Sequence, residues 1–209
     1  MIIAVDGPTA SGKGTIAKAL AARFGLPHLD TGLLYRAVAR QVLLAGGNPD
    51  DAATALAATN FPESLLLEPA LRGEETGGLA SRVSVHAAVR EALFKRQRSF
   101  ATQPGGAVLD GRDIGTIIAP DADVKLFVVA TVEARAKRRW KEMQERGESH
   151  TLDQIEADLR LRDERDRTRA EAPLRAADDA AILDTSDLDR EAAIEAAIAL
   201  VEARISASR

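Results

Sequence analysis

Cysteine is absent from this 209-residue sequence, which excludes disulfides, thiolate metal sites and a cysteine nucleophile. Aromatic residues make up only 3% of the chain, and this argues against a stacking surface for single-stranded nucleic acid. No apolar run is long enough to span a bilayer, and the opening "MIIAV" lacks the basic segment of a signal peptide. We therefore expect a soluble, cytoplasmic protein.

An excess of positive charge is also missing. Lys and Arg number 28 against 32 Asp and Glu, for a net charge of -4, so no general attraction to nucleic acid or to an anionic membrane is expected. Any anion site must gather its positive groups locally. The length and the 45% hydrophobic content fit one domain with an inserted or hinged part. No apolar stripe indicates an oligomer, so we expect a monomer.

Short apolar runs alternate with helical periodicity along the chain. Strands are predicted at "MIIAVD", "LPHLD", "GGAVLDG", "DVKLFVVAT" and "AAILD". Helices are predicted from Thr31 to about Gly46, from Ser81 to Phe100, from Thr131 to about Arg146, from Thr151 (a capping box with Gln154) and over the stripe Ile194, Ile198, Val201 and Ile205. This alternation predicts an α/β fold whose parallel sheet, of about five strands, is flanked by helices. Residues 60–79 predict a small hairpin or an irregular insert.

The stretch "GPTASGKGT", here called the phosphate loop (residues 7–15), has the Walker A spacing. It follows a predicted strand and opens a predicted helix, so a glycine-rich turn that merely starts a helix is the weaker interpretation. Lys13 is the expected point charge for the β- and γ-phosphates of ATP. Gly14 occupies the usual Mg²⁺-ligating position and the hydroxyl comes at Thr15, so phosphates and waters are expected to hold most of the magnesium. The expected ATP contacts are Gly7, Pro8, Thr9, Ala10, Ser11, Gly12, Lys13, Gly14 and Thr15.

The form G-x-x-x-x-G-K-G-T is typical of nucleoside monophosphate kinases. With "LDTGLLYRAVA", "ASRVSVHAAVREAL", "VLDGRDIGTIIAPDADVKLFV" and "RDERDRTRAEAPL", the chain resembles the bacterial cytidylate kinases over nearly its full length. An adenylate kinase is expected to read Asp-Gly-Phe-Pro-Arg where this chain reads "DGRD" at residues 110–113. The resemblance implies a single domain over residues 1–209 with a P-loop NTPase-type sheet. Its expected parts are a core (1–30, 101–138 and 170–209), a monophosphate-binding region (31–100, with an insert at about 60–79) and a helical lid (about 139–169).

The resemblance also implies a second nucleotide site, for CMP or dCMP. Thr31 and Arg36 are expected to hold its phosphate, while Ser81, Arg90 and Asp113 are expected to face the pyrimidine. A carboxylate at Asp113 suits the amino group of cytosine and should repel the carbonyl of uracil. Two alternatives stay open at this point. Ser81 could be a helix N-cap with or without substrate contact, and Arg90 could be an exposed arginine.

Asp110 ends a predicted strand, where parallel sheets bind their ligands, and is expected to orient magnesium-bound water. Arg112 and Asp113 follow at the same edge. In isolation this pair would be interpreted as a salt bridge, but beside a phosphate loop substrate contact is favoured.

The run "RLRDERDRTR" divides by helix face. Arg162, Asp166 and Arg169 share one face, and the resemblance makes them substrate contacts, with the arginines on phosphates and Asp166 on the ribose. Solvated ion pairs are expected for Arg160, Asp163, Glu164 and Arg167, and Arg165 receives no assignment. Upstream, Arg135 and Arg139 either approach ATP or form an exposed basic face.

The predicted reaction is transfer of the γ-phosphoryl group of ATP to CMP or dCMP. Catalysis is expected to rest on Lys13, Arg112, Arg162 and Arg169 with Mg²⁺, because an anionic acceptor needs charge neutralisation rather than a base. None of the three histidines, His28, His86 and His150, has a clustered partner in the sequence, so no metal or acid–base role is expected for them. Two alternatives remain: another small-molecule kinase acting on UMP or AMP, and a non-catalytic nucleotide-binding switch.

Overall fold

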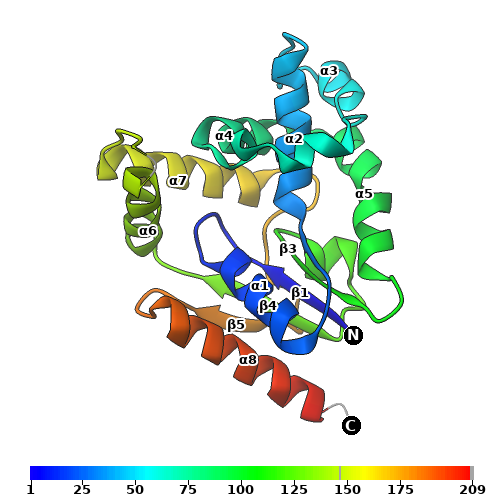
Figure 1. Ribbon diagram of the computed structural model, residues 1–209, viewed down its shortest axis with the longest axis vertical. Coiled ribbons are helices and arrows are strands. Elements are labelled where there is room, and N and C mark those ends of the chain that lie inside the picture. The colour runs from blue at the N-terminus through cyan, green and yellow to red at the C-terminus, as the bar shows by residue number, and fades with distance from the viewer. Residues whose placement is uncertain (146, 208–209) are drawn as a thin grey trace.

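The computed structural model describes residues 1–145 and 147–207 (Figure 1). The strands are β1 (Ile2–Asp6), β2 (His28–Asp30), β3 (Ala107–Gly111), β4 (Val124–Val129) and β5 (Ala181–Asp184). The α-helices are α1 (Lys13–Phe24), α2 (Thr31–Leu44), α3 (Ala52–Ala57), α4 (Glu74–Val83), α5 (Ala87–Ala101), α6 (Val132–Glu145), α7 (Leu152–Thr168) and α8 (Arg190–Ala207). Two short 3₁₀ helices are η1 (Glu63–Leu67) and η2 (Pro69–Arg72), and a short π-helix is η3 (Ile114–Ile118).

The five strands form one parallel sheet in the order β2-β3-β1-β4-β5. This confirms the predicted α/β fold and all of the predicted strands. The central strand β1 is flanked by β3 and β4. From β1 the chain runs to the edge strand β2, returns to β3 and then crosses to β4 and β5 on the other side of β1. Parallel sheets of this kind bind ligands at the carboxyl ends of the strands, beside the point where the order reverses.

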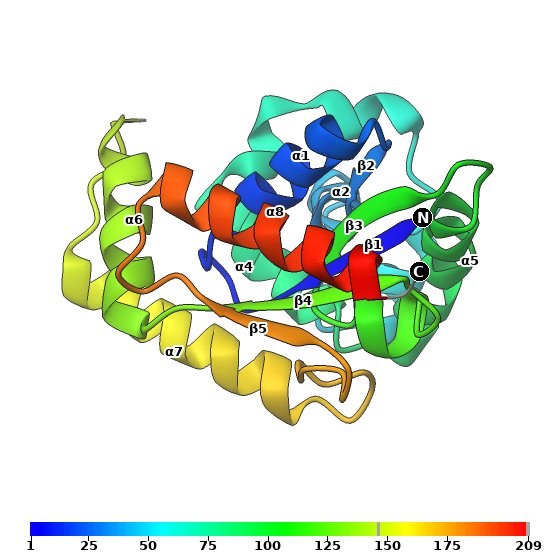
Figure 2. The same ribbon diagram turned by 90° about the horizontal axis from the view of Figure 1, so that it is seen from below.

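Alternate residues of the strands face two different apolar layers. Ile3, Val5 and Leu126 belong to the cluster that α1 and α8 cover, with Leu20 and Val201 buried against the sheet (Figure 2). The cluster on the other face contains Ala4, Leu109, Ile114 and Ile118 together with Ala101 of α5. This period-two pattern is what a sheet covered on both faces requires.

Two helical parts have apolar clusters of their own. Helices α2, α3, α4 and α5 enclose a cluster that includes Leu34, Val38 and Val89. Helices α6 and α7 pack around Ala136, Met143, Ile155 and Leu159, and they lie to one side of the sheet, next to α4 (Figure 1). The predicted capping box starts α7, because Thr151 Oγ1 accepts from Gln154 N and Gln154 Oε1 accepts from Thr151 N. Within the described ranges, no helix is both long and apolar enough to cross a membrane.

Of the two alternatives for residues 60–79, the hairpin is wrong and the irregular insert is confirmed. Two short 3₁₀ turns, η1 and η2, lead into α4. Each turn begins at a proline, with Pro62 at the N-cap of η1 and Pro69 as the first residue of η2, and buries one leucine, Leu65 or Leu71, against α2. Because Arg36 donates to the backbone oxygens of Leu71 and Gly73, no partner strand is needed to satisfy these carbonyls.

The single helix predicted from Ser81 to Phe100 is divided into α4 and α5. His86 lies between them in an extended conformation, and its ring contacts the Pro49 oxygen at 2.9 Å. Val85, beside this break, is 39% exposed, whereas Val89 and Leu93 of α5 are buried. Ser81 lies inside α4, so the alternative that made it an N-cap is wrong, and Asp30 is the N-cap of α2, whose first residue is Thr31. The helix after Thr131 ends at Glu145, and Arg146 lies outside the described residues.

Candidate functional site

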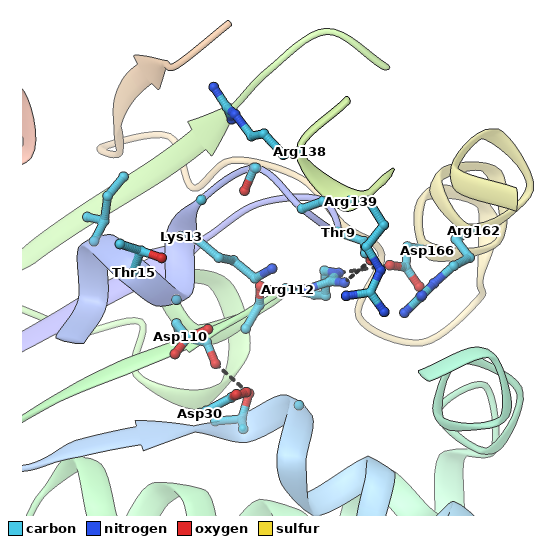
Figure 3. Close-up of a pocket in the computed structure, with 18 of the residues that line it drawn as sticks. Thr9, Lys13, Thr15, Asp30, Asp110, Arg112, Arg138, Arg139, Arg162 and Asp166 are labelled. Atoms are coloured by element: carbon cyan, nitrogen blue, oxygen red, sulfur yellow. Dashed lines mark hydrogen bonds and ion pairs between the residues drawn. The ribbon is translucent and has the colours of Figure 1, made fainter. Parts of the chain in front are cut away.

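One cavity of about 620 Å³ lies at the carboxyl ends of the strands, between the phosphate loop, α2, α4 and the α6–α7 pair (Figure 3). Three of the residues predicted from the sequence to form the site, Gly7, Pro8 and Arg135, are outside its lining. The others line it: Thr9, Ala10, Ser11, Gly12, Lys13, Gly14, Thr15, Thr31, Arg36, Ser81, Arg90, Asp110, Arg112, Asp113, Arg139, Arg162, Asp166 and Arg169. The chain therefore brings segments from positions 9 to 169 to one cavity.

The phosphate loop curls tightly between β1 and α1. Gly12, at the N-cap of α1, has a left-handed backbone with φ of 89°, which glycine adopts at least cost. Gly7 lies so close to β4 that a Cβ atom there would stand 2.1 Å from the Val128 oxygen. Thr185 holds the other side of the loop, since its hydroxyl donates to the Ser11 oxygen at 3.0 Å. The loop thus presents the amino end of α1 to the cavity, as anion binding requires.

Lys13 is the first residue of α1, and its Nζ donates to the Pro8 oxygen at 3.1 Å. Burial, and then the positive charge of Arg112, lowers the pKa of Lys13 to about 7. Lys13 and Arg112 extend into the same space between the phosphate loop and α7 (Figure 3). An anion bound between them would relieve their repulsion, so this space is suited to phosphate groups.

Carboxylates gather on the opposite side of Lys13, where β2 and β3 end side by side. Asp30 and Asp110 are paired across the two strands, and burial followed by the Asp110 charge raises the pKa of Asp30. His28 Nε2 lies 2.7 Å from Asp110 Oδ1, so His28 does have a partner, which the sequence did not indicate. The other carboxylate oxygen of Asp110 faces the phosphate loop, 3.6 Å from where a Cβ of Gly14 would lie.

Arg112 joins the phosphate loop to α7. Its Nε donates to Asp166 Oδ2 at 2.8 Å and its Nη2 to Thr9 Oγ1 at 2.6 Å (Figure 3). The simple Arg112–Asp113 salt bridge considered from the sequence is not formed. Burial acts against ionisation of Asp166, but Arg112, Arg169 and Arg162 together lower its pKa, so it is an anionic anchor for the surrounding arginines.

Asp6 supports the loop that carries Arg112 and Asp113. Its carboxylate accepts from the Ile114 and Gly115 backbone N–H groups at 2.9 and 2.8 Å. Burial raises the pKa of Asp6 to about 7, against the effect of these two donors. Asp6 was not predicted as a site residue, although an acidic residue at the end of a buried strand could have indicated one.

Asp113 lies among three cationic or aromatic side chains. It accepts a short hydrogen bond from Arg90 Nη2, and Arg169 Nη2 lies 3.8 Å from its Oδ1. The Arg90 guanidinium stands 5.6 Å from the centre of the Tyr35 ring. Only 10% of the Arg90 side chain is exposed, so the alternative of a solvent-exposed arginine is wrong.

Ser81 and Arg36 come from facing helices, α4 and α2. Arg36 donates to the Leu71 and Gly73 oxygens at 2.8 and 2.9 Å, and its guanidinium packs against Gly77. A Cβ on Gly77 would stand 2.8 Å from Arg36 Nη2. Ser81 is not an N-cap, and its Oγ accepts from Arg165 Nη1 at 3.0 Å.

Helix α6 places its two predicted arginines differently: Arg139 lines the cavity, whereas Arg135 fits neither of the sequence-based alternatives. Arg135 is only 2% exposed and pairs with Asp163 of α7 at 2.6 and 3.0 Å. It also donates to the Thr9 oxygen, so it braces the phosphate loop without reaching the cavity. Asp163 was expected to be solvated, and this prediction is wrong because Asp163 is buried in that pair. Arg160, Glu164 and Arg167 are exposed as predicted.

Arg138 is a cavity residue that the sequence analysis did not identify. It donates to Thr185 Oγ1 at 3.1 Å and also to the Thr185 backbone oxygen, and Thr185 directly follows β5. Arg138 is a neighbour of Arg139 in a run of basic residues, so the residue type alone does not indicate that it lines the cavity. The remaining residues of the lining that were not predicted are Ile16, Lys18, Asp30, Gly32, Tyr35, Arg72, Ala80, Ser84, Gly111, Glu142, Thr185, Leu188, Asp189, Arg190 and Ala193.

Comparison with known proteins identifies clear relatives. Residues 3–203 match the sequence profile of the family described as cytidylate kinase. A curated cytidylate kinase of Xanthobacter autotrophicus (strain ATCC BAA-1158 / Py2) is 57% identical, with 98% of each chain covered. One from Rhodopseudomonas palustris (strain HaA2) is 54% identical, covering 97% of this chain and 96% of its own.

Solved structures agree at the level of the fold. An uncharacterised protein from Eubacterium ventriosum ATCC 27560 is similar with a TM-score of 0.56 and 15% identity, covering 97% of this chain and 98% of its own. A sugar kinase from Janibacter sp. HTCC2649 is similar with a TM-score of 0.50 and 16% identity, covering 96% and 93%. At such identities the similarity supports a kinase-like α/β architecture and nothing finer.

Proposed function

The chain belongs to the cytidylate kinase family, and we propose on that premise that it transfers the γ-phosphoryl group of ATP to CMP or dCMP, releasing ADP and CDP or dCDP. The observation that carries this proposal is the single cavity shared by the phosphate loop and the arginine cluster around Asp113. A donor site and an acceptor site in one enclosed space are what phosphoryl transfer between two nucleotides requires.

The donor lies along the phosphate loop. Its phosphates are cradled by the backbone of residues 9–15 and by the Lys13 ammonium. The cavity continues past Lys13 to Arg138 and Arg139 of α6, and to Leu188 and Arg190 before and at the start of α8. We assign this end to the adenosine, because it combines an apolar side chain with planar guanidinium groups that can stack on a base.

The acceptor lies at the opposite end. Thr31 and Arg36, near the start of α2, hold the CMP phosphate, and Arg36 exchanges its present backbone partners for that anion. Ser81, Arg90 and Asp113 face the pyrimidine. The Asp113 carboxylate accepts from the exocyclic amino group, which cytosine has and uracil lacks. Asp166 serves the ribose hydroxyls.

Catalysis on this proposal is electrostatic. The attacking oxygen belongs to an ionised phosphate, so no general base is needed. Lys13, Arg112, Arg162 and Arg169 neutralise the charges that would otherwise keep two anions apart. Arg112 is fixed for this task by Thr9 on one side and Asp166 on the other, so little reorganisation is needed when the nucleotides bind.

Magnesium fits the acidic side of the cavity. The Asp110 carboxylate and the Thr15 hydroxyl supply the oxygen donors that Mg²⁺ prefers, and the Asp30 carboxyl lies beside Asp110 at the same cavity. On this proposal nucleotide phosphates and waters hold most of the metal. When bound, the ion would neutralise charge on the phosphate oxygens. His28 would then orient the Asp110 carboxylate through their hydrogen bond, without contacting the ion itself.

The division into core, monophosphate-binding region and lid is part of the same proposal. The separate apolar clusters of α2–α5 and of α6–α7 support it, because parts with their own cores can move as units. Closure of the lid over ATP would exclude water and limit wasteful hydrolysis. A monomeric state, a cytoplasmic location and the absence of nucleic-acid or membrane partners stay predictions from the sequence.

Two other functions were open from the sequence. A UMP or AMP kinase would share the phosphate loop, but the Arg90–Asp113 pair and the family relationship favour cytosine. A non-catalytic switch would have no use for the arginines that surround Asp113 and Asp166. We therefore retain the switch only as an outcome that experiment can reveal.

A coupled ADP-release assay with CMP, dCMP, UMP and AMP offered separately tests the proposal. We expect CMP and dCMP to be the preferred acceptors by at least tenfold in kcat/KM, since one buried charge-assisted hydrogen bond accounts for a difference of that order. A preference for AMP or UMP would overturn the assignment. ATP hydrolysis that no monophosphate stimulates would instead indicate the switch.

A further inference from the structure

Arg165, the one arginine of the 160–169 run without an expected role, contacts a residue of the acceptor site. Its Nη1 donates to Ser81 Oγ at 3.0 Å. The bond crosses from α7 to α4, two helices that pack against one another but belong to the lid and to the monophosphate-binding region. Ser81 lines the cavity and is 7% exposed, whereas Arg165 is only half-buried and is not part of the lining. Arg165 therefore reaches the Ser81 hydroxyl from behind the cavity wall.

The direction of this hydrogen bond biases what the hydroxyl can do. A serine hydroxyl offers one donor and two acceptor lone pairs, and its hydrogen rotates to suit the surroundings. An arginine guanidinium can only donate, so it occupies one of the two lone pairs. Donation to the oxygen polarises the O–H bond, which makes the hydroxyl a stronger donor and a weaker acceptor toward the cavity.

We propose that Arg165 is a positioning residue that holds the Ser81 oxygen in place, strengthens its hydroxyl as a hydrogen-bond donor and so favours an acceptor atom of the pyrimidine. Cytosine presents an acceptor at N3, where uracil carries an N–H. A serine without this partner could serve either base equally, by donating to one or accepting from the other. A serine whose oxygen already accepts from Arg165 donates more strongly to cytosine N3 and accepts more weakly from the uracil N–H, which favours cytosine. This role adds a second test of the base to the one at Asp113, and it rests on the proposed function.

The same contact could have only a structural role in joining two helices. The two interpretations differ in what they predict. A structural link affects stability and both substrates, because α7 also carries Arg162 and Asp166. A positioning role affects the pyrimidine alone, and it disappears when the Ser81 hydroxyl is removed.

Arg165→Met tests the role, because methionine retains much of the aliphatic length without any donor. We expect kcat/KM for CMP to fall about three- to tenfold and the CMP-to-UMP preference to fall with it, as loss of one hydrogen bond predicts. KM for ATP and the melting temperature should stay near the parent values. Arg167→Met is the matched control, since Arg167 lies on the same helix and is exposed. It should change neither kcat/KM nor the preference by more than about twofold.

A double-mutant cycle with Ser81→Ala makes the test specific. In the Ser81→Ala background, the change at position 165 should cost less than about twofold, because there is no hydroxyl left to orient. An equal loss in both backgrounds, or an unchanged CMP-to-UMP preference in Arg165→Met, would overturn the proposal. If Arg165→Met does not fold, Arg165→Leu, which also lacks a donor, takes its place in the same cycle. The parent enzyme's own use of CMP tests the proposed function, so failure of one is distinguishable from failure of the other.

Discussion

At the scale of single residues, Lys13 couples phosphate binding to protonation. Its pKa is lowered from 10.5 to about 7, so between these values the unfolded chain binds more protons than the folded one. The cost of burying the ammonium is therefore fully present below pH 7 and decreases as the pH rises toward 10.5. Phosphate groups beside Lys13 would favour the ammonium and return its pKa toward the ordinary value.

We expect binding of magnesium–ATP at pH 8 to take up on the order of one proton, and binding at pH 6 to take up much less. Titration calorimetry in buffers of different ionisation enthalpy measures this uptake directly. Lys13→Arg is the control, because arginine stays charged throughout this range and leaves no proton to gain. Equal uptake by the parent and Lys13→Arg at pH 8 would show that Lys13 is not the group that titrates.

Asp113 gives a second prediction at this scale. Asp113→Ala removes the carboxylate that pairs with Arg90 and faces the amino group of the pyrimidine in our proposal. We expect the ratio of kcat/KM for CMP to that for UMP to fall about ten- to hundredfold, the range for a hydrogen bond to a charged group. KM for ATP should change much less, because Asp113 lies at the acceptor end. Equal ratios in the variant and the parent would refute this role.

The phosphate loop was predictable from its spacing, and Arg112 from its place after a predicted strand end. Helical spacing grouped Arg162 with Asp166, but only the family resemblance made them substrate contacts. The sequence did not separate Arg135 from Arg138. Both lie in a helix with basic residues on several faces, and which face meets the cavity depends on Asp163 of α7 and Thr185 after β5. These partners are 28 and 47 residues away, so no local pattern reveals them.

At the scale of elements, α4 carries a pair of adjacent glycines with different surroundings. Arg36 of α2 packs against Gly77, and a Cβ there would meet its guanidinium at 2.8 to 3.1 Å. No atom lies within 4 Å of a Cβ added to Gly78. The close approach of α2 and α4 at Gly77 is what lets Arg36 lie between the insert carbonyls and the cavity.

Gly77→Ala should therefore displace Arg36 and weaken CMP binding. We expect KM for CMP to rise about three- to tenfold, a loss of the size expected for one disturbed hydrogen bond, with KM for ATP unchanged. Gly78→Ala is the control and should leave KM for CMP unchanged while stabilising the helix by up to about 1 kcal/mol. Initial-rate kinetics with urea unfolding for each variant makes both measurements. Identical effects of the two changes on KM for CMP would contradict the importance of the Arg36 contact.

The strands and the capped helix α7 were predictable because their signals are local: apolar runs, and Thr151 with Gln154. The break between α4 and α5 was not, because Ser81 to Phe100 has continuous helical character. The chain turns there where the His86 ring meets the Pro49 oxygen, a partner 37 residues away. The sequence could not choose between a hairpin and an irregular insert for a similar reason, since a side chain of α2, and no second strand, satisfies the carbonyls of Leu71 and Gly73.

At the scale of the whole molecule, the cavity belongs to none of the parts alone. The core supplies the phosphate loop and Asp110, α2 and α4 supply Thr31 and Ser81, and α7 supplies Arg162 and Asp166. These parts are tied together by the Arg112–Asp166 bond within the cavity and by the Arg165–Ser81 bond behind its wall. Ligands that contact several parts should therefore stabilise the folded chain as a unit.

CMP alone, without ATP, should raise the melting temperature. A ligand that binds only the native state stabilises it by about 2.7 kcal/mol at a hundred times its Kd. For a chain of this length, that corresponds to roughly 5 to 10 °C. AMP and inorganic phosphate at the same concentration serve as controls, and should shift the transition by much less because neither offers a cytosine to Arg90 and Asp113.

A switch that binds only ATP predicts no shift of the melting temperature with CMP. A shift with AMP as large as that with CMP would count against pyrimidine recognition. Differential scanning fluorimetry with each compound therefore separates the kinase from the switch without relying on turnover, since the acceptor end of the cavity is either formed before ATP arrives or it is not.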